Sequence, residues 1–113
     1  MKTVLTIEES QRLIDLGVDP KMASKEPFIF NEIFTLTDIL AILPKEIGNG
    51  YNLNIDITGA YYGAAYVCWD EDENGDAVIK DIRFDVIDPE LIDALYKLLI
   101  WCIDNGHIKL KEK

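Results

Sequence analysis

A strict alternation of apolar and polar side chains runs through Tyr51-Asn52-Leu53-Asn54-Ile55-Asp56-Ile57-Thr58. Because successive side chains of a β-strand point to opposite faces, this stretch predicts a strand with one apolar face and one wet face. Such a strand is typical of an antiparallel sheet that covers a core with one side only. We therefore expect an antiparallel sheet built around residues 51–58.

The residues that follow predict two more strands. Residues 61–69 are rich in aromatic side chains, and Asn74-Gly75 is a strong hairpin signal before a third strand over 77–87. Every second residue of that third strand, apart from Lys80, is apolar and predicts its apolar face: Val78, Ile82, Phe84 and Val86. The opposite face is expected to be charged, with Asp81, Arg83 and Asp85. The centre of the chain thus predicts a three-stranded antiparallel meander.

Two helix signals precede the meander. Thr6 followed by Glu9 fits a capping box that opens a helix over about 7–16, with Gly17 as its left-handed C-terminal cap. The pair at 19–20, Asp-Pro, predicts one further turn through Ala23. Residues 35–38, Thr-Leu-Thr-Asp, predict a second helix, which Pro44 ends. Between them, Pro27-Phe28-Ile29-Phe30 predicts a short edge strand.

A last helix is predicted after the meander. Asp88-Pro89-Glu90 supplies a cap, a first-turn proline and a first-turn acid, and Gly106 caps the helix after about Asn105. The expected fold class is α+β, a single domain over residues 1–113. It consists of N-terminal helices, a three-stranded antiparallel meander and a C-terminal helix packed on the apolar face of the sheet.

The last helix carries more apolar surface than an ordinary surface helix, since only a narrow wedge of it is polar. One interpretation is that the helix is sandwiched between the sheet and the N-terminal helices. The other is a protein–protein contact surface around Tyr96, Ile100 and Trp101, for which a symmetric homodimer is the simplest form.

The charge is unevenly distributed. With 21 acidic and 11 basic side chains, the 113 residues carry a net charge of −10. This argues against binding to nucleic acid or to anionic membranes, because Lys and Arg side chains supply most of the attraction to such surfaces. Residues 70–88 hold eight acidic and two basic side chains, so a net −6 falls on the hairpin and its returning strand. An alternative function follows from this cluster: a DNA mimic whose acidic face, formed by Asp81 and Asp85 with Asp70 and Asp72 nearby, occupies the basic groove of a nucleic-acid-binding protein.

The same acidic loop matches the start of a calcium-binding loop. Asp70, Asp72, Asn74 and Asp81 stand at positions 1, 3, 5 and 12 of that pattern, with Gly75 at position 6. However, both flanks read as strands rather than as the helices of an EF-hand. The alternatives are a weak divalent-cation loop and a solvated hairpin tip.

Nothing in the chain forms a catalytic or cofactor-binding motif, and we expect no cofactor and no enzymatic activity. His107 is the only histidine, and it follows the last helix, where a cation complements the helix C-terminus. Cys68 and Cys102 are too few and too far apart for a disulfide framework or a zinc site. The longest apolar run, over 98–103, is much shorter than a membrane span, so we expect a cytoplasmic protein with reduced thiols.

Three ordered stretches carry a resemblance to a known group of proteins. They are Leu13-Ile14-Asp15-Leu16-Gly17-Val18-Asp19, residues 34–47 from Phe34-Thr35-Leu36-Thr37-Asp38 to Leu43-Pro44-Lys45-Glu46-Ile47, and residues 91–106. In this order they resemble an uncharacterised family of short proteins from Bacteroides-type bacteria and their phages or mobile elements. That family has no assigned activity, so no residue roles are implied. The resemblance implies a bacterial cytosolic setting and a phage-related accessory role.

Overall fold

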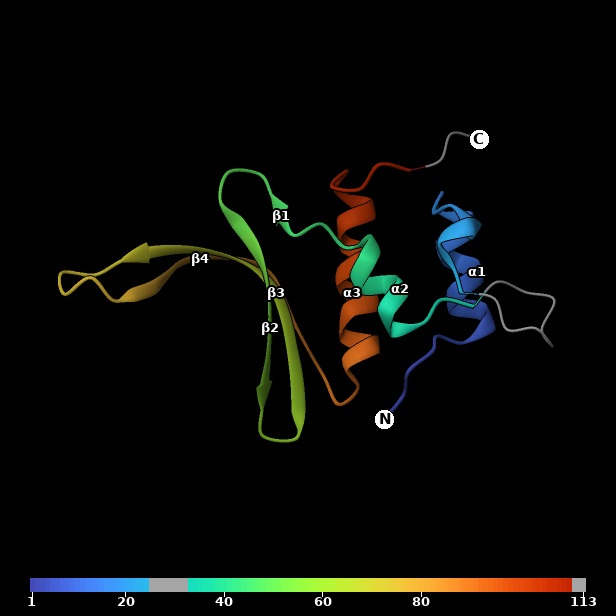
Figure 1. The fold of residues 1–113 in the computed structure, drawn as a ribbon, viewed down its shortest axis with the longest axis horizontal. Helices are drawn as coiled ribbons and strands as arrows, with labels where there is room; N and C mark the ends of the chain where they lie inside the picture. The colour runs from blue at the N-terminus through green and yellow to red at the C-terminus, as the bar shows by residue number, and fades with distance from the viewer. Residues whose placement is uncertain (25–32, 111–113) are drawn as a thin grey trace.

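The computed structural model describes residues 1–24 and 33–110, and the strand predicted over Pro27–Phe30 lies outside these residues. In the described part, helices on one side of an antiparallel sheet define an α+β fold (Figure 1). The helical elements are α1 (Ile7–Asp15), the 3-10 turn η1 (Pro20–Met22), α2 (Leu36–Ile42) and α3 (Leu91–Asp104). The strands are β1 (Glu46–Ile47), β2 (Tyr51–Thr58), β3 (Tyr61–Glu71) and β4 (Ala77–Asp88).

Local capping signals set the first two helices, as predicted. The hydroxyl of Thr6 accepts a hydrogen bond from the Glu9 amide, and the Glu9 carboxylate accepts one from the Thr6 amide. Thr35 and Asp38 form the same reciprocal pair at the start of α2. Each box satisfies two backbone donors that a helix N-terminus otherwise leaves free. Gly17 follows α1 with φ +109°, which confirms its role as the left-handed cap.

The sheet has four strands rather than the predicted three, in the order β1-β2-β3-β4. The additional strand is β1, whose residues Glu46 and Ile47 pair with Asn52 and Tyr51. The turn between β1 and β2 contains Gly48 and Gly50, both with positive φ, which lets the chain fold back at once. A two-residue strand has no periodicity of its own, so the pattern of the sequence alone did not predict it.

Two register shifts in β4 overturn its predicted faces. Lys80 has no partner in β3, because Asp81 pairs with Cys68 and Ile79 with Trp69. Phe84 and Asp85 together face the single residue between Ala64 and Tyr66 of β3. Each extra residue reverses the alternation of side chains along the strand. As a result, Ile82 and Val86 lie on opposite faces of the sheet: Val86 packs in the core, whereas Ile82 pairs with Val67 on the far side.

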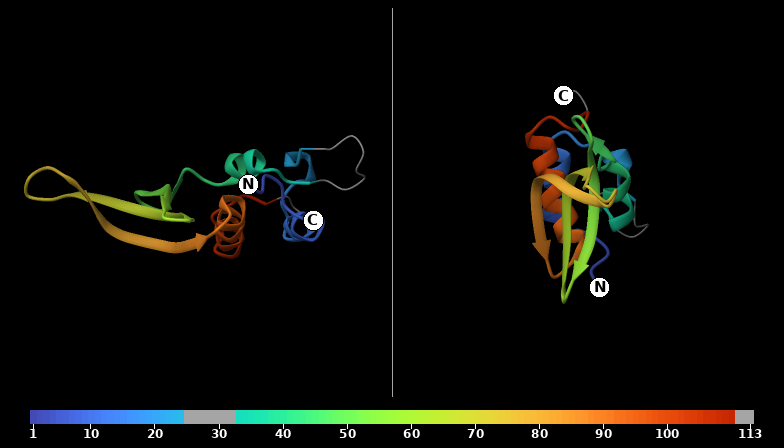
Figure 2. Two further views of the ribbon diagram at one scale, coloured as in Figure 1. Left: turned by 90° about the horizontal axis from the view of Figure 1, so that it is seen from below. Right: turned by 90° about the vertical axis from the view of Figure 1, so that its left-hand side faces the viewer.

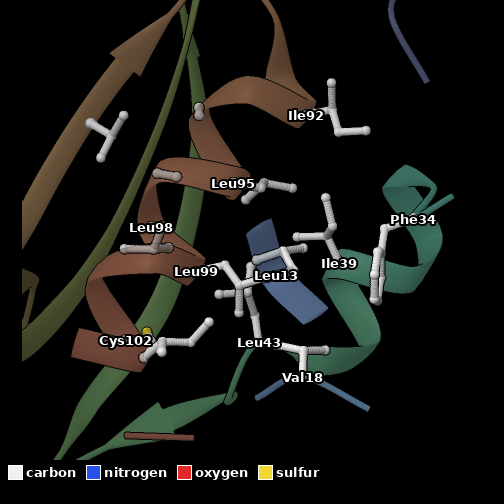
Figure 3. Close-up of a cluster of buried hydrophobic side chains, with 14 of the residues drawn as sticks. Leu13, Val18, Phe34, Ile39, Leu43, Ile92, Leu95, Leu98, Leu99 and Cys102 are labelled. Carbon is white, nitrogen blue, oxygen red and sulfur yellow. The ribbon is translucent and has the colours of Figure 1, made fainter. Parts of the chain in front are cut away.

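Helix α3 lies between the sheet and the other helices, as the left view of Figure 2 shows. Its side chains point toward Leu13 of α1 and Ile39 of α2 on one side (Figure 3) and contact β3 and β4 on the other. Seven of its fourteen residues are buried: Ile92, Ala94, Leu95, Leu98, Leu99, Cys102 and Ile103. The sandwich interpretation of the apolar excess is therefore confirmed.

The helices do not cover the whole sheet. On β2, Tyr51 and Leu53 are half-buried against the core, but Ile55 and Ile57 are 40% and 70% exposed. The predicted apolar face of this strand is therefore covered by the helices over its first half only. The far ends of β3 and β4 form an arm over residues 69–79 that turns away from the helices (Figure 1) and stretches the molecule to 56 Å.

The start of α3 also differs from the prediction. The helix begins at Leu91, two residues later than the Asp-Pro signal indicates, and the Asp88 carboxylate accepts a hydrogen bond from the Glu90 amide. Gly106 follows the helix with φ +73°, as expected of a left-handed cap.

Candidate functional site

The three residues predicted as a contact surface line one depression on the molecule. Tyr96, Ile100 and Trp101 are half-buried side chains of α3, and they lie in a trough of about 700 Å³ between α1, α3 and the end of β4. We call this the α3 trough. Its apolar floor consists of these three residues and Phe84, and its polar rim is formed by Lys2, Thr6, Glu9, Arg12, Asp88, Asp93, Lys97 and Asp104.

Stacked rings stiffen one half of the floor. The Trp101 indole lies 5.2 Å from the ring of Phe84 with an interplanar angle of 17°, and 6.2 Å from the ring of the buried Tyr66. The His107 ring lies 5.1 Å from the indole, with the two planes inclined by 34°. His107 therefore packs on Trp101, a role that its position after the helix did not predict. Offset ring stacking of this kind is favourable and restricts the motion of all partners.

Phe84 enters the floor through an unusual backbone conformation. Its φ is +51°, and no other described non-glycine residue has a positive φ. The left-handed region costs a bulky residue about 1–2 kcal/mol. Such strain persists only where the surroundings compensate for it, and it is concentrated at functional sites. The sequence contains no signal for this strain, because the β4 register shift that produces it depends on pairing with β3.

The charges of the rim are largely paired with one another. Lys2 Nζ lies 2.8 Å from Asp93 Oδ1 and 3.2 Å from Glu9 Oε1. Lys97 Nζ lies 2.7 Å from Asp88 Oδ2. The hydrogen bond to Asp93 raises the pKa of Lys2, and the hydrogen bond from Lys97 lowers the pKa of Asp88. With three basic and four acidic side chains, the rim is close to neutral although the chain is strongly acidic.

Two buried polar groups lie beneath the floor. The Tyr66 hydroxyl donates a hydrogen bond of 2.8 Å to the carbonyl of Pro44. Burial raises the pKa of both Tyr66 and Cys102, so the phenol and the thiol are neutral at physiological pH. A buried, protonated thiol is a poor nucleophile. These groups therefore support the core rather than supplying chemistry to the trough.

The acidic loop closes as a β-hairpin. The Asp72 carboxylate accepts hydrogen bonds from the amides of Asn74 and Asp76, at 2.8 and 3.0 Å, and so stabilises the turn itself. The Asp70 carboxylate accepts a hydrogen bond from the Glu71 amide, and the Asp81 carboxylate accepts one from the Tyr51 hydroxyl. Of the predicted cation ligands, Asp70, Asp72 and Asp81 thus accept hydrogen bonds from different groups, and Asn74 bonds Asp72 through its backbone amide. Across residues 1–24 and 33–110, no three acidic, histidine or cysteine side chains gather as a metal site would require.

The acidic residues proposed for DNA mimicry do not share one face. Asp81 bonds Tyr51 on the face of the sheet that carries the helices. Asp85 borders a small hollow on the opposite face, together with Asn54 and Asp56. The prediction that Asp81 and Asp85 belong to one face of the sheet is therefore wrong. The shift at Phe84 and Asp85 separates them.

Comparisons with known proteins add no relationship. No family model matches the chain, and no curated protein or solved structure is significantly similar to it. Among the described residues, no helix is both long and apolar enough to cross a membrane.

Proposed function

We propose that this protein acts without catalysis, by binding an apolar segment of a partner protein in the α3 trough. The observation that carries the proposal is the Phe84–Trp101 stack at the floor of the trough. The chain adopts a strained backbone at Phe84 to present this ring. Rigid aromatic floors of this kind are enriched where proteins bind one another.

The chemistry of the trough favours an uncharged anchor in the partner. Lys2 and Lys97 are already bonded to carboxylates of the rim, so a ligand charge would have to compete with these pairs. The apolar floor, in contrast, is only partly covered by the rest of the described chain. A large aliphatic or aromatic side chain would gain about 1.5–3 kcal/mol by leaving water there. Because the rim is nearly neutral, the binding should depend little on salt.

We place this activity in the cytosol. The free thiols of Cys68 and Cys102 support a reducing compartment, since neither is part of a disulfide in the described residues. The resemblance to short proteins of bacteria and phages supports an accessory role in such a cell.

Selection from a random peptide library against the immobilised protein tests the proposal. We expect binders with one large apolar anchor. Their affinity should fall at least about tenfold in Ile100→Asp and should change less than about threefold between low and high salt. Ile57→Asp is the matched control, because it places the same charge at an exposed isoleucine of β2 outside the trough.

Two outcomes would reject the proposal. One is a set of selected peptides whose affinities are equal in the wild type and Ile100→Asp. The other is a concentration-dependent dimer that Ile100→Asp abolishes, since the trough would then bind a second copy of this chain. Thermal unfolding of both variants shows that each is folded, and Ile100→Ala serves as a milder substitution.

A further inference from the structure

The face of the sheet that points away from the helices carries a second apolar surface. Tyr66 packs in the core, so its neighbours Ala65 and Val67 point to the other side. Cross-strand pairing places Ile82 beside Val67 and Ile79 beside Trp69 on that side. We call these residues, together with Ile87, the outer sheet face. The right view of Figure 2 looks onto this face, and no described helix crosses it.

The outer sheet face is large enough to bind a single segment. Trp69, Ile79 and Ile82 are 46%, 50% and 45% exposed, and Ile87 is 63% exposed. Together they leave an apolar patch of roughly 400 Å², about half of what each partner contributes to a standard protein interface. The patch therefore matches one helix or strand with its flanking polar side chains better than it matches a whole subunit.

The outer sheet face contains a small hollow lined by residues of β2, β3 and β4. It measures about 90 Å³, and its floor includes Ala65 and Val67, which are buried although no described helix covers them. The arm turns toward this side (Figure 1), and Ile79 of the arm and Ile82 of β4 also line the hollow. Gly63 makes room for the Asp56 carboxylate at the border of the hollow, since a Cβ there would lie 2.4 Å from Asp56 Oδ1. The hollow has room for about one aliphatic side chain.

The β4 edge of the sheet is guarded, whereas this face is not. Two register shifts distort β4, and bulged edge strands are a usual means of preventing strand addition. Strand addition at β4 is therefore disfavoured, whereas a partner can approach the outer sheet face directly.

Charge decides which partner fits. The residues around the hollow include the carboxylates of Asp56 and Asp85 and no lysine or arginine. The arm adds five acidic side chains over residues 70–76 and no basic one. A second copy would bring the same acidic groups against these, which is unfavourable. We infer that the outer sheet face binds a basic amphipathic segment of a partner protein, with one aliphatic side chain in the hollow and Lys or Arg side chains facing Asp56, Asp85 and the arm.

This inference is independent of the α3 trough, and the two tryptophans allow the surfaces to be tested separately. In Trp101→Phe, Trp69 is the only tryptophan and reports on the outer sheet face. The probe is a helical peptide of leucine and lysine with one apolar face. The controls are its leucine–glutamate counterpart and an oligolysine of the same charge.

We expect the leucine–lysine peptide to shift Trp69 emission to the blue and to bind at least about tenfold more tightly than either control peptide. Binding should weaken with salt. Ile82→Ser should weaken it about fivefold or more, and Asp85→Asn about twofold with a smaller salt dependence. The matched controls Ile57→Ser, on the opposite face of the sheet, and Glu8→Gln, on α1, should bind as the parent does.

Three outcomes would overturn the inference. The first is equal binding by the leucine–glutamate peptide, and the second is an unchanged affinity in Ile82→Ser. The third is a peptide that changes the emission of Trp101 in Trp69→Phe but does not change the emission of Trp69 in Trp101→Phe. A blue shift of Trp69 on raising protein concentration alone, lost in Ile82→Ser, would assign the face to a second copy and also overturn it. Thermal unfolding of the Ile82 and Asp85 variants confirms that they are folded.

Discussion

The ring of Phe84 lies nearly parallel to the indole of Trp101, with their centroids 5.2 Å apart and their planes inclined by 17°. Phe84 reaches this position with φ +51°, a conformation that costs a non-glycine residue about 1–2 kcal/mol. Stacking contributes about 0.5–1.5 kcal/mol beyond the burial of apolar area. The contact and the strain are thus of similar size, and the stack accounts for the retention of the strained backbone.

Substitution of Phe84 by glycine and by alanine separates strain from stacking. Both variants lose the ring, so both should be less stable than the wild type by about 1–3 kcal/mol. Phe84→Gly should nevertheless be more stable than Phe84→Ala by about 1 kcal/mol, because glycine adopts positive φ without a penalty. Urea unfolding measures the difference.

Val78 provides the control for this prediction, since it is an exposed residue of the same strand with a regular partner in Asp70. There the order should reverse, with Val78→Ala more stable than Val78→Gly. If alanine were the better residue at both positions, Phe84 would not be strained in solution.

Asp38 should govern part of the acid unfolding. Burial would raise the pKa of this carboxyl, but hydrogen bonds from Thr35 and Ser24 outweigh burial and hold the pKa below its ordinary value of 3.8. A carboxylate with a lowered pKa contributes stability above the unfolded pKa and loses it as the pH falls through the folded pKa. The wild type should therefore lose stability between pH 5 and pH 3 more steeply than Asp38→Asn, as measured by urea unfolding. Parallel curves for the two proteins would contradict this assignment.

The ion pair between Lys97 and Asp88 should affect the pKa of Asp88 more than the free energy of unfolding. Lys97→Met removes the hydrogen bond to Asp88, so the pKa of Asp88 should rise toward its ordinary value, which NMR titration measures. Because the Lys97 side chain is 55% exposed, solvent screens the pair, and the loss of stability should stay below about 1 kcal/mol and vanish at high salt. A pKa of Asp88 that does not move would show that the pair is not formed in solution.

The two thiols should differ in reactivity. Cys102 is fully buried and burial raises its pKa, whereas Cys68 is half-buried on β3. A thiol reagent should therefore modify one cysteine of the native protein and the second only after unfolding. Cys68→Ser should abolish the native reaction. Rapid modification of Cys102 in that variant would show that the core opens more readily than the structure indicates.

The helices could be predicted because their signals are local. Thr6 with Glu9 and Thr35 with Asp38 each close a hydrogen-bonded box within four residues, so the pattern contains the whole interaction. Tyr96, Ile100 and Trp101 can be predicted in the same way: the helical period places Tyr96 and Trp101 on either side of the polar stripe and Ile100 inside it. Their role in binding a partner stays a prediction.

The sheet could be predicted only in outline. Lys80 interrupts the apolar row of β4, and this interruption is the one sign of a bulge in the sequence. The bulge reverses the faces of the strand, but this reversal depends on the pairing with β3. For that reason the outer sheet face, with Ile79 and Ile82, was missed. The period-two pattern predicts Phe84 on the apolar face of its strand, but its stack on Trp101 joins residues far apart in the sequence, and the sequence pattern contains no trace of it.

One titration tests the central claim most directly. Trp69→Phe leaves Trp101 as the only tryptophan, so its emission reports on the floor of the α3 trough. A peptide selected against the wild-type protein should shift the emission of Trp101 in this variant, with an affinity that hardly changes with salt, and should leave Trp69 unchanged in Trp101→Phe. Saturating binding without any response of Trp101 would contradict the account.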